Sequence, residues 1–207
     1  AYGVLEDEAI RRLIGSPFEE FDVGEVVARL GDVQVLAPVG PQKIICVGLN
    51  YQGHIRETGL PTPEFPMLFM KPLTAMVGPG EPIIYPRKGR EVEYEGELVA
   101  VIGKAAKNVR EELALEYVLG YTCGNDVSER GWQSADLQWF RAKGADTFGP
   151  LGPTIVTGLD YGDLLLETRL NVETVQSQRT ADLIFDVHAC VSYISQYMTL
   201  LPGDVTY

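Results

Sequence analysis

Long apolar runs and basic residues are what this sequence of 207 residues most clearly lacks. No segment approaches the roughly 18 consecutive apolar residues that a membrane-spanning helix requires, so we expect a soluble protein with no membrane partner. The 17 Lys and Arg residues are outnumbered by 29 Asp and Glu residues, which gives a net charge of −12. Because this excess of acid would repel a phosphate backbone, we expect no nucleic-acid partner.

Cysteine and histidine are also scarce, with three Cys and two His residues. The cysteines, Cys46, Cys123 and Cys190, are odd in number and lie in apolar segments. This is typical of buried, reduced thiols in a cytoplasmic protein. A chain of this length, with 45% apolar residues, can bury a core without disulfide bonds.

Residues 1–41 predict a small N-terminal α+β module. The expected elements are strands at Tyr2–Leu5 and Ile10–Leu13 and a helix from about Glu25 to Gly31. Asp22 and Glu25 have the spacing of a helix-capping pair, and glycine is a common helix stop. A Pro-rich joint at residues 37–41 separates this module from the rest of the chain.

Residues 43–207 predict a second, β-dominated domain. The expected strands are Lys43–Val47, Met67–Met70, Ile83–Tyr85, Glu95–Ile102, Leu119–Gly124, Thr154–Thr157 and Leu166–Val172, and the expected helices are 50–58, 108–120 and 187–201. Few helices among many short strands favour a β-dominated α+β fold over a doubly wound sheet. The Pro202-Gly203-Asp204 turn should open a further strand, so we expect this domain to be incomplete at its C-terminus.

The strongest local signal for chemistry is the pair Glu95 and Glu97, which leads into the apolar run Leu98–Ile102. Alternate residues of a strand share a face, so the two carboxylates would point the same way, about 6.5 to 7 Å apart. Burying them is costly unless a cation or a proton neutralises them. The alternative is that both are simply solvated at the end of a strand.

A third oxygen ligand is available at Asp126, at the end of another expected strand. Three carboxylates without a nearby Cys or His would suit Mg²⁺ or Mn²⁺, with Ca²⁺ as a further option. For Asp126 alone, an ordinary strand-end turn beside Asn125 is the alternative.

A second group of candidate residues lies on the expected helix after the first strand of this domain. His54 and Glu57 would share one face of that helix at a spacing of three residues. A carboxylate beside an imidazole orients it and raises its basicity, as a general base for water requires. The alternative is a surface histidine in a local ion pair, and the other histidine, His188, lies beside an apolar stripe and is interpreted as structural.

Basic and amide side chains follow Asp126 along the sequence, namely Arg130, Gln133, Arg141 and Lys143. Cations close to an acidic metal site would bind an anionic substrate and stabilise an enolate as it forms. For any single one of them, solvent exposure is the alternative.

Taken together, these motifs resemble the fumarylacetoacetate hydrolase family over residues 43–207. They are Cys46-Val47-Gly48-Leu49-Asn50-Tyr51 with His54 and Glu57, Lys71-Pro72, Glu95-x-Glu97, Asn125-Asp126 with Arg130, and Arg141-x-Lys143-x-x-Asp146-Thr147-Phe148. The segment before Lys43 is similar to the small N-terminal module of acylpyruvase-like members.

The resemblance implies a mixed β-sandwich roll that binds a divalent metal, which chelates two oxygens of a small 2-oxo or 1,3-dioxo acid. The implied roles are metal ligation by Glu95, Glu97 and Asp126, water activation by His54 with Glu57, enolate stabilisation by Lys143, and substrate contact by Arg130 and Gln133. It also implies a homodimer. Hydrolytic cleavage of a carbon–carbon bond is the predicted reaction, because the dyad supplies a water nucleophile.

Three alternatives in function remain open. Isomerisation of 2-hydroxymuconate-like dioates and decarboxylation of oxaloacetate pass through a similar enolate, and a non-catalytic metal-binding protein is the third. The sequence departs from the family pattern at Gly131, where many relatives have Asp, and at Asn171-Val172, where Gly is expected after Asn. Because Val resists the positive φ that Gly allows, this second change should affect a hairpin.

Overall fold

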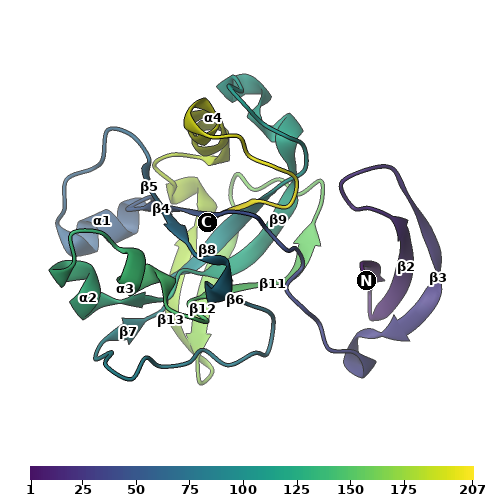
Figure 1. The fold of residues 1–207 in the computed structure, drawn as a ribbon, viewed down its shortest axis with the longest axis horizontal. Coiled ribbons are helices and arrows are strands. Elements are labelled where there is room, and N and C mark those ends of the chain that lie inside the picture. The colour runs from purple at the N-terminus through teal and green to yellow at the C-terminus, as the bar shows by residue number, and fades with distance from the viewer.

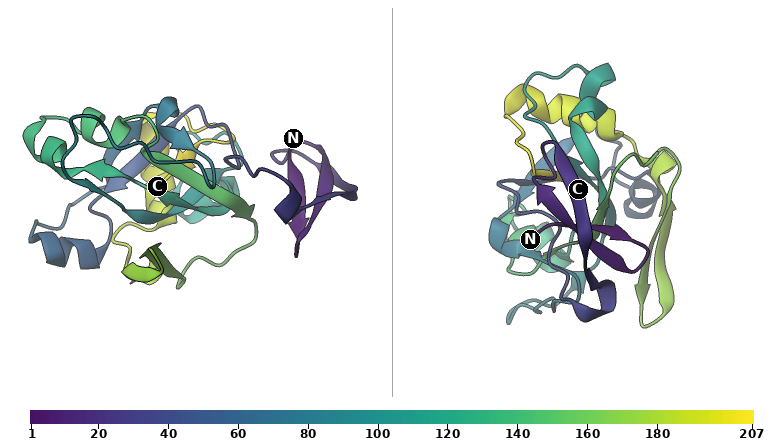
Figure 2. Two further views of the ribbon diagram at one scale, coloured as in Figure 1. Left: turned by 90° about the horizontal axis from the view of Figure 1, so that it is seen from below. Right: turned by 90° about the vertical axis from the view of Figure 1, so that its right-hand side faces the viewer.

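A computed structural model describes the backbone of all 207 residues and every side chain except that of Thr58. The N-terminal part is a three-stranded antiparallel sheet in the order β1-β2-β3. Its strands are β1 (Gly3–Glu6), β2 (Ala9–Gly15) and β3 (Phe21–Arg29), followed by a 3-10 turn at Leu30–Asp32. Figures 1 and 2 show this sheet at one end of the molecule, beside the larger body formed by the rest of the chain.

The helix expected from Glu25 is wrong, because these residues belong to β3. Val26 and Val27 are β-branched, which restricts their side chains in a helix and suits them to a strand. Pairing with β2 also supplies backbone hydrogen-bond partners along the segment. Asp22 therefore caps no helix, and the N-terminal module is a β-sheet instead of the expected α+β unit.

The larger body is built on a seven-stranded mixed sheet in the order β5-β4-β14-β8-β9-β11-β6. Its strands are β4 (Ile44–Gly48), β5 (Met67–Lys71), β6 (Met76–Val77), β8 (Gly96–Ile102), β9 (Val118–Asn125), β11 (Gly149–Val156) and β14 (Val205–Thr206). Two shorter ladders join β7 (Val92–Glu93) to β10 (Ser128–Glu129) and β12 (Leu165–Leu170) to β13 (Glu173–Arg179).

Short helices connect these strands. They are α1 (Gln52–Thr58), α2 (Arg130–Ala135), α3 (Phe140–Gly144) and α4 (Val187–Tyr197), with 3-10 turns at Leu73–Ala75, Glu111–Tyr117 and Thr180–Asp182. The prediction of a β-dominated fold with few helices is confirmed. Among the described residues, no helix combines the length and the hydropathy that a membrane span needs.

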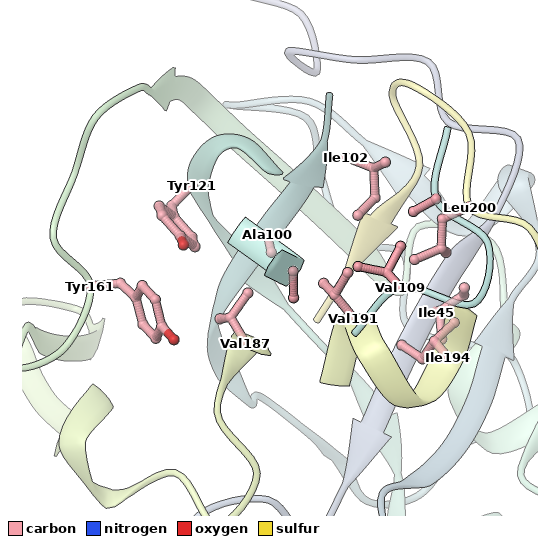
Figure 3. Packing of buried hydrophobic residues seen from close by; sticks show 12 residues of the cluster. Ile45, Ala100, Ile102, Val109, Tyr121, Tyr161, Val187, Val191, Ile194 and Leu200 are labelled. Atoms are coloured by element: carbon pink, nitrogen blue, oxygen red, sulfur yellow. The ribbon is translucent and has the colours of Figure 1, made fainter. Parts of the chain in front are cut away.

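The central sheet buries side chains on both faces. Alternate residues of β8 divide between two cores: Ala100 and Ile102 join the cluster under α4, and Val99 and Val101 join the cluster on the other face. Figure 3 shows Val187, Val191 and Ile194 of α4 packed over the first of these clusters. Because both faces are covered, the near-continuous apolar run of β8 is what a central strand requires.

Two segments do not form the elements that the sequence predicts, and their backbone conformation or contacts explain why. Ile83–Tyr85 forms no strand, since it lies between two prolines and the Ile84 amide donates to Thr147 Oγ1 at 2.7 Å. The helix expected over 108–120 is only the 3-10 turn Glu111–Tyr117. Asn108 takes a left-handed φ of 51° and so cannot act as the extended N-cap that the prediction needed.

The hairpin between β12 and β13 forms despite the unfavourable residue at its turn. Asn171 and Val172 have φ of 48° and 69°, and Val172 is 94% exposed. A left-handed backbone conformation destabilises a β-branched residue by about 1–2 kcal/mol. Glycine would avoid this strain, but its greater conformational freedom in the unfolded chain would cancel part of the gain.

We therefore expect Val172→Gly to stabilise the protein by about 0.5–1 kcal/mol. Thermal unfolding would show a rise of about 1–4 °C in Tm. Thr174→Gly is the matched control, because it places glycine inside β13 and should lower Tm. A fall in Tm for Val172→Gly would show that the turn is not strained.

Candidate metal and substrate site

Two neighbouring strands bring the three predicted metal ligands together. β8 and β9 are antiparallel, and Gly96 lies opposite Asn125, so Glu95 and Glu97 lie beside Asp126. The Asp126 amide donates to the Glu95 carbonyl at 2.8 Å, and the Glu95 amide donates to Asn125 Oδ1 at 2.9 Å. One carboxylate oxygen from each of the three acids lies within 4.8 Å of the others.

Two buried lysines lie against this acidic cluster. Lys143 Nζ is 2.9 Å from both carboxylate oxygens of Glu95 and 2.7 Å from Asp126 Oδ2. Lys71 Nζ is 2.6 Å from Asp126 Oδ1, and it also donates to the backbone carbonyls of Val127 and Lys143. Lys71 therefore holds both a predicted ligand and the helix that carries Lys143.

Arg130 and its neighbours complete the cluster on its more open side. Arg130 Nη1 is 2.5 Å from Glu95 Oε1 and 2.8 Å from Gln133 Oε1, and Nε is 2.7 Å from Glu93. Ser128 Oγ donates to Glu95 Oε1 at 3.0 Å. The two predicted substrate-binding residues, Arg130 and Gln133, thus contact each other at the edge of the acidic cluster.

The charges of the cluster are strongly interdependent. Burial alone would raise the pKa of Glu95, but Lys143 and Arg130 lower it to about 2. Burial and the charges of Asp126 and Glu95 raise the pKa of Glu97 well above its usual range. Burial also raises the pKa of Asp126, against the effect of the two lysines. Although burial disfavours its charge, Lys143 has a raised pKa because of Asp126 and Glu95.

This donor set fits a hard divalent cation. It consists of carboxylate oxygens, which Mg²⁺ and Mn²⁺ prefer. Among the described atoms, Asp126 Oδ1 is buried and accepts no hydrogen bond, although Lys71 Nζ lies close to it. Burial and the charges of Asp126 and Glu95 raise the pKa of Glu97 more than Lys143 and Lys71 lower it, so a further positive charge would stabilise its ionised form. Glu95, Glu97 and Asp126 would hold such an ion.

The predicted dyad lies on α1, at the end of the molecule remote from the N-terminal sheet (Figures 1 and 2). The helix ends where the sequence predicts, and Gly59 follows it with a left-handed φ of 67°. The side chain of His54 is half-buried and that of Glu57 is exposed. The helical spacing is therefore as expected, and the role of the two residues stays a prediction.

A small cavity lies between Glu97 and the residues that precede α1. It has a volume of about 30 Å³, and Asn50, Tyr51 and Glu97 are among the residues that line it. Asn50 is held in place by two hydrogen bonds with the backbone of Phe185, at 2.8 and 2.9 Å. The residues just before α1 are thus adjacent to a predicted metal ligand, which places the helix near the site.

Sequence reasoning did not find every residue of the site. Lys71 contributes to the family resemblance, but nothing in the sequence assigns it a role. Its only signal is a lysine at the end of an otherwise apolar strand, Met67–Lys71. Gln176, whose side chain hydrogen-bonds to the backbone of Gly96, carries no sequence signal, because the two residues are 80 positions apart.

Comparisons with known proteins identify the families that the two parts of the chain match. Residues 43–207 match the family described as the C-terminal domain of fumarylacetoacetate (FAA) hydrolase, and residues 1–38 match one described as Rv2993c-like, N-terminal. A mitochondrial oxaloacetate tautomerase of Xenopus laevis is 40% identical over 89% of this chain and 60% of its own length.

Solved structures show the same relationship. A 5-carboxymethyl-2-hydroxymuconate delta-isomerase of Mycobacterium smegmatis has a TM-score of 0.89 and 44% identity, covering 99% of this chain and 80% of that one. A 2-hydroxyhepta-2,4-diene-1,7-dioate isomerase of Mycobacterium marinum has a TM-score of 0.88 and 45% identity, covering 96% and 75%. The chain therefore belongs to the fumarylacetoacetate hydrolase family.

Proposed function

We propose that this chain is a divalent-metal-dependent enzyme that acts on a small anionic 2-oxo or 1,3-dicarbonyl acid through an enolate. The observation that carries this proposal is Lys143, a buried cation in contact with two of the three clustered carboxylates. A cation fixed in a poorly solvated site can stabilise negative charge as it develops on a substrate oxygen. The relatives named above carry the names of enzymes that act on oxaloacetate, which is a 2-oxo acid, or on 2-hydroxy dienoic diacids, which are enols of 2-oxo acids.

In this proposal, some residues of the site bind the metal and the substrate, and others stabilise negative charge. Glu95, Glu97 and Asp126 would hold Mg²⁺ or Mn²⁺, which as a Lewis acid polarises a carbonyl oxygen. Arg130, oriented by Glu95 and Glu93, offers a guanidinium for a substrate carboxylate. Asp126 and Glu95 raise the pKa of Lys143 against the effect of burial, which favours a role as a cation over a role as a base.

Hydrolytic cleavage of a carbon–carbon bond is the leading reaction. It requires His54, assisted by Glu57, to take a proton from a water molecule that attacks the substrate carbonyl. This role is supported by Asn50 and Tyr51, which directly precede α1 and line a cavity together with Glu97. The second candidate is tautomerisation or isomerisation, which the names of the relatives favour.

Replacing His54 by alanine separates the two reactions. If the chain is a hydrolase, we expect hydrolysis of acylpyruvates to fall about 10²–10⁴-fold, because the general base is lost. Keto–enol exchange of oxaloacetate should change only a few-fold. The measurement is a panel of acylpyruvates, oxaloacetate and 2-hydroxymuconate-type dioates assayed with Mg²⁺.

His188→Ala is the matched control, since this other histidine lies on α4 and contacts the carbonyl of Glu111. Its activities should match those of the unsubstituted chain. Acylpyruvate hydrolysis that survives His54→Ala would contradict the role of the dyad. Activity toward none of the panel would contradict the proposed substrate class.

A further inference from the structure

β8, which begins between the predicted ligands Glu95 and Glu97, has no neighbouring strand along part of one edge. β9 covers one edge of β8 from Gly96 to Ile102, but β14 covers the other edge only at Ala100 and Val101. Gly96, between Glu95 and Glu97, is buried and lies outside the part that β14 reaches. A buried backbone N–H or C=O without a partner costs about 1–3 kcal/mol, so this position requires another partner.

The side chain of Gln176, on β13, supplies that partner. The Gly96 amide donates to Gln176 Oε1 at 2.8 Å, and Gln176 Nε2 donates to the Gly96 carbonyl at 2.9 Å. The side-chain amide thus pairs with both polar groups of one residue, as the backbone of an adjacent strand would. These two hydrogen bonds link residues 80 positions apart in the sequence.

Other contacts orient this glutamine and bring the hairpin close. Thr168 Oγ1, on β12, donates to Gln176 Oε1 at 2.8 Å. Tyr94 donates its hydroxyl to the Val175 carbonyl at 3.1 Å. A Cβ on Gly96 would lie 2.2 Å from Thr168 Oγ1, so only glycine allows this approach. The β12–β13 hairpin, seen below the central sheet in Figure 1, therefore contacts the segment that bears the ligands.

We infer that Gln176, oriented by Thr168, is a positioning residue for the metal site, and that its pairing with Gly96 sets the separation of the Glu95 and Glu97 carboxylates. The inference rests on the proposed metal site and adds to it the hairpin that controls its geometry. Because Gly96 lies between Glu95 and Glu97, hydrogen bonds that hold its backbone also hold the Cα positions of both ligands. Partners that orient ligands in this way typically change metal affinity by about 10–100-fold when they are removed.

The test is Gln176→Leu, which removes both hydrogen bonds and keeps a side chain of similar size. We expect the dissociation constant for Mn²⁺, measured by calorimetry on the full chain, to rise at least 10-fold. The electron paramagnetic resonance spectrum of bound Mn²⁺ should also change, because the ligand geometry is altered. The Tm of the metal-free variant reports whether folding is preserved.

The matched control is Gln178→Leu. Gln178 also faces Gly96, but its Nε2 lies at the longer distance of 3.5 Å from the carbonyl. We expect its Mn²⁺ affinity to stay within twofold of the unsubstituted chain. An equal loss of affinity in the control would overturn the specific role of Gln176, because any change on β13 would then suffice.

A second variant covers the case in which Gln176→Leu does not fold. Thr168→Val keeps the shape of the side chain and removes only the hydroxyl that orients Gln176, so a loss of affinity of about threefold or more is expected. Unchanged affinity and an unchanged spectrum in the folded variants would overturn this inference alone. Failure of the unsubstituted chain to bind Mn²⁺ would overturn the proposed metal site, and this inference with it.

Discussion

Glu97→Gln should lose detectable Mg²⁺ and Mn²⁺ binding and at least about 10³-fold of the enzymatic activity. The substitution removes one of three carboxylates that lie within 4.8 Å of one another and leaves the shape of the site intact. An amide oxygen is a weaker ligand than a carboxylate for a hard cation. The loss of an electrostatic group aimed at the reacting centre typically costs about 10²–10³ in rate, and the loss of the ion adds to this.

The same carboxylate predicts how metal affinity depends on pH. Burial and two neighbouring acids raise the pKa of Glu97, so in the absence of metal this group tends to hold a proton. A metal must displace that proton, and binding therefore weakens as the pH falls and strengthens as it rises. Calorimetry at several pH values, in buffers of different ionisation enthalpy, would measure both the affinity and the proton release.

Glu112→Gln is the control for these measurements. Glu112 is exposed and pairs with Arg110, away from the acidic cluster. It should bind metal and turn over substrate like the unsubstituted chain. Metal affinity that is unchanged in Glu97→Gln, or independent of pH, would mean that the ion is held elsewhere.

Asp204→Ala is expected to destabilise the protein by about 3–5 kcal/mol. Asp204 is fully buried, and its carboxylate accepts hydrogen bonds from the amides of Gln42, Lys43 and Leu201 at 3.1, 2.8 and 2.7 Å. It also forms an ion pair with Lys43 Nζ at 2.6 Å. Its removal leaves a largely buried cation and three amides without their acceptor, and these costs add to the lost contacts.

The measurement is urea or thermal unfolding with a chelator present, so that metal binding does not contribute. For a protein of this size the expected fall in Tm is about 6–20 °C. Glu112→Ala is the comparison, because it removes an exposed ion pair and should cost no more than about 1 kcal/mol. Similar losses in the two variants would show that Asp204 is no more important than a surface charge.

Much of the larger body could be predicted from sequence because its signals are local. The apolar run of β8 and the helical spacing of α4 identify both elements, although α4 ends at Tyr197 where the prediction extended it to Leu201. The N-terminal segment shows the limit of such signals. A capping pair and a glycine stop favour a helix there, but backbone pairing with β2 stabilises a strand instead.

The part of the candidate site that could be predicted from the sequence consists of charged residues in or next to apolar segments, where such residues are unusual. Paired acids that enter a buried strand are costly, so Glu95 and Glu97 stand out in the sequence alone. The cations Arg130 and Lys143 follow Asp126 closely enough to suggest a common site. Gln176 pairs with the backbone of Gly96, and Lys71 binds backbone carbonyls as well as Asp126; a glutamine or lysine that binds backbone leaves no pattern in the sequence.

By itself, the sequence determined the β-dominated class, the family and the residue types that could bind a cation, because burial and charge are properties of short segments. Only the tertiary structure decided which groups meet. β8 and β9 bring Asp126 to Glu95 and Glu97, and the β12–β13 hairpin brings Gln176 to Gly96. Such contacts depend on strand register and on the closure of long loops, which no local pattern encodes.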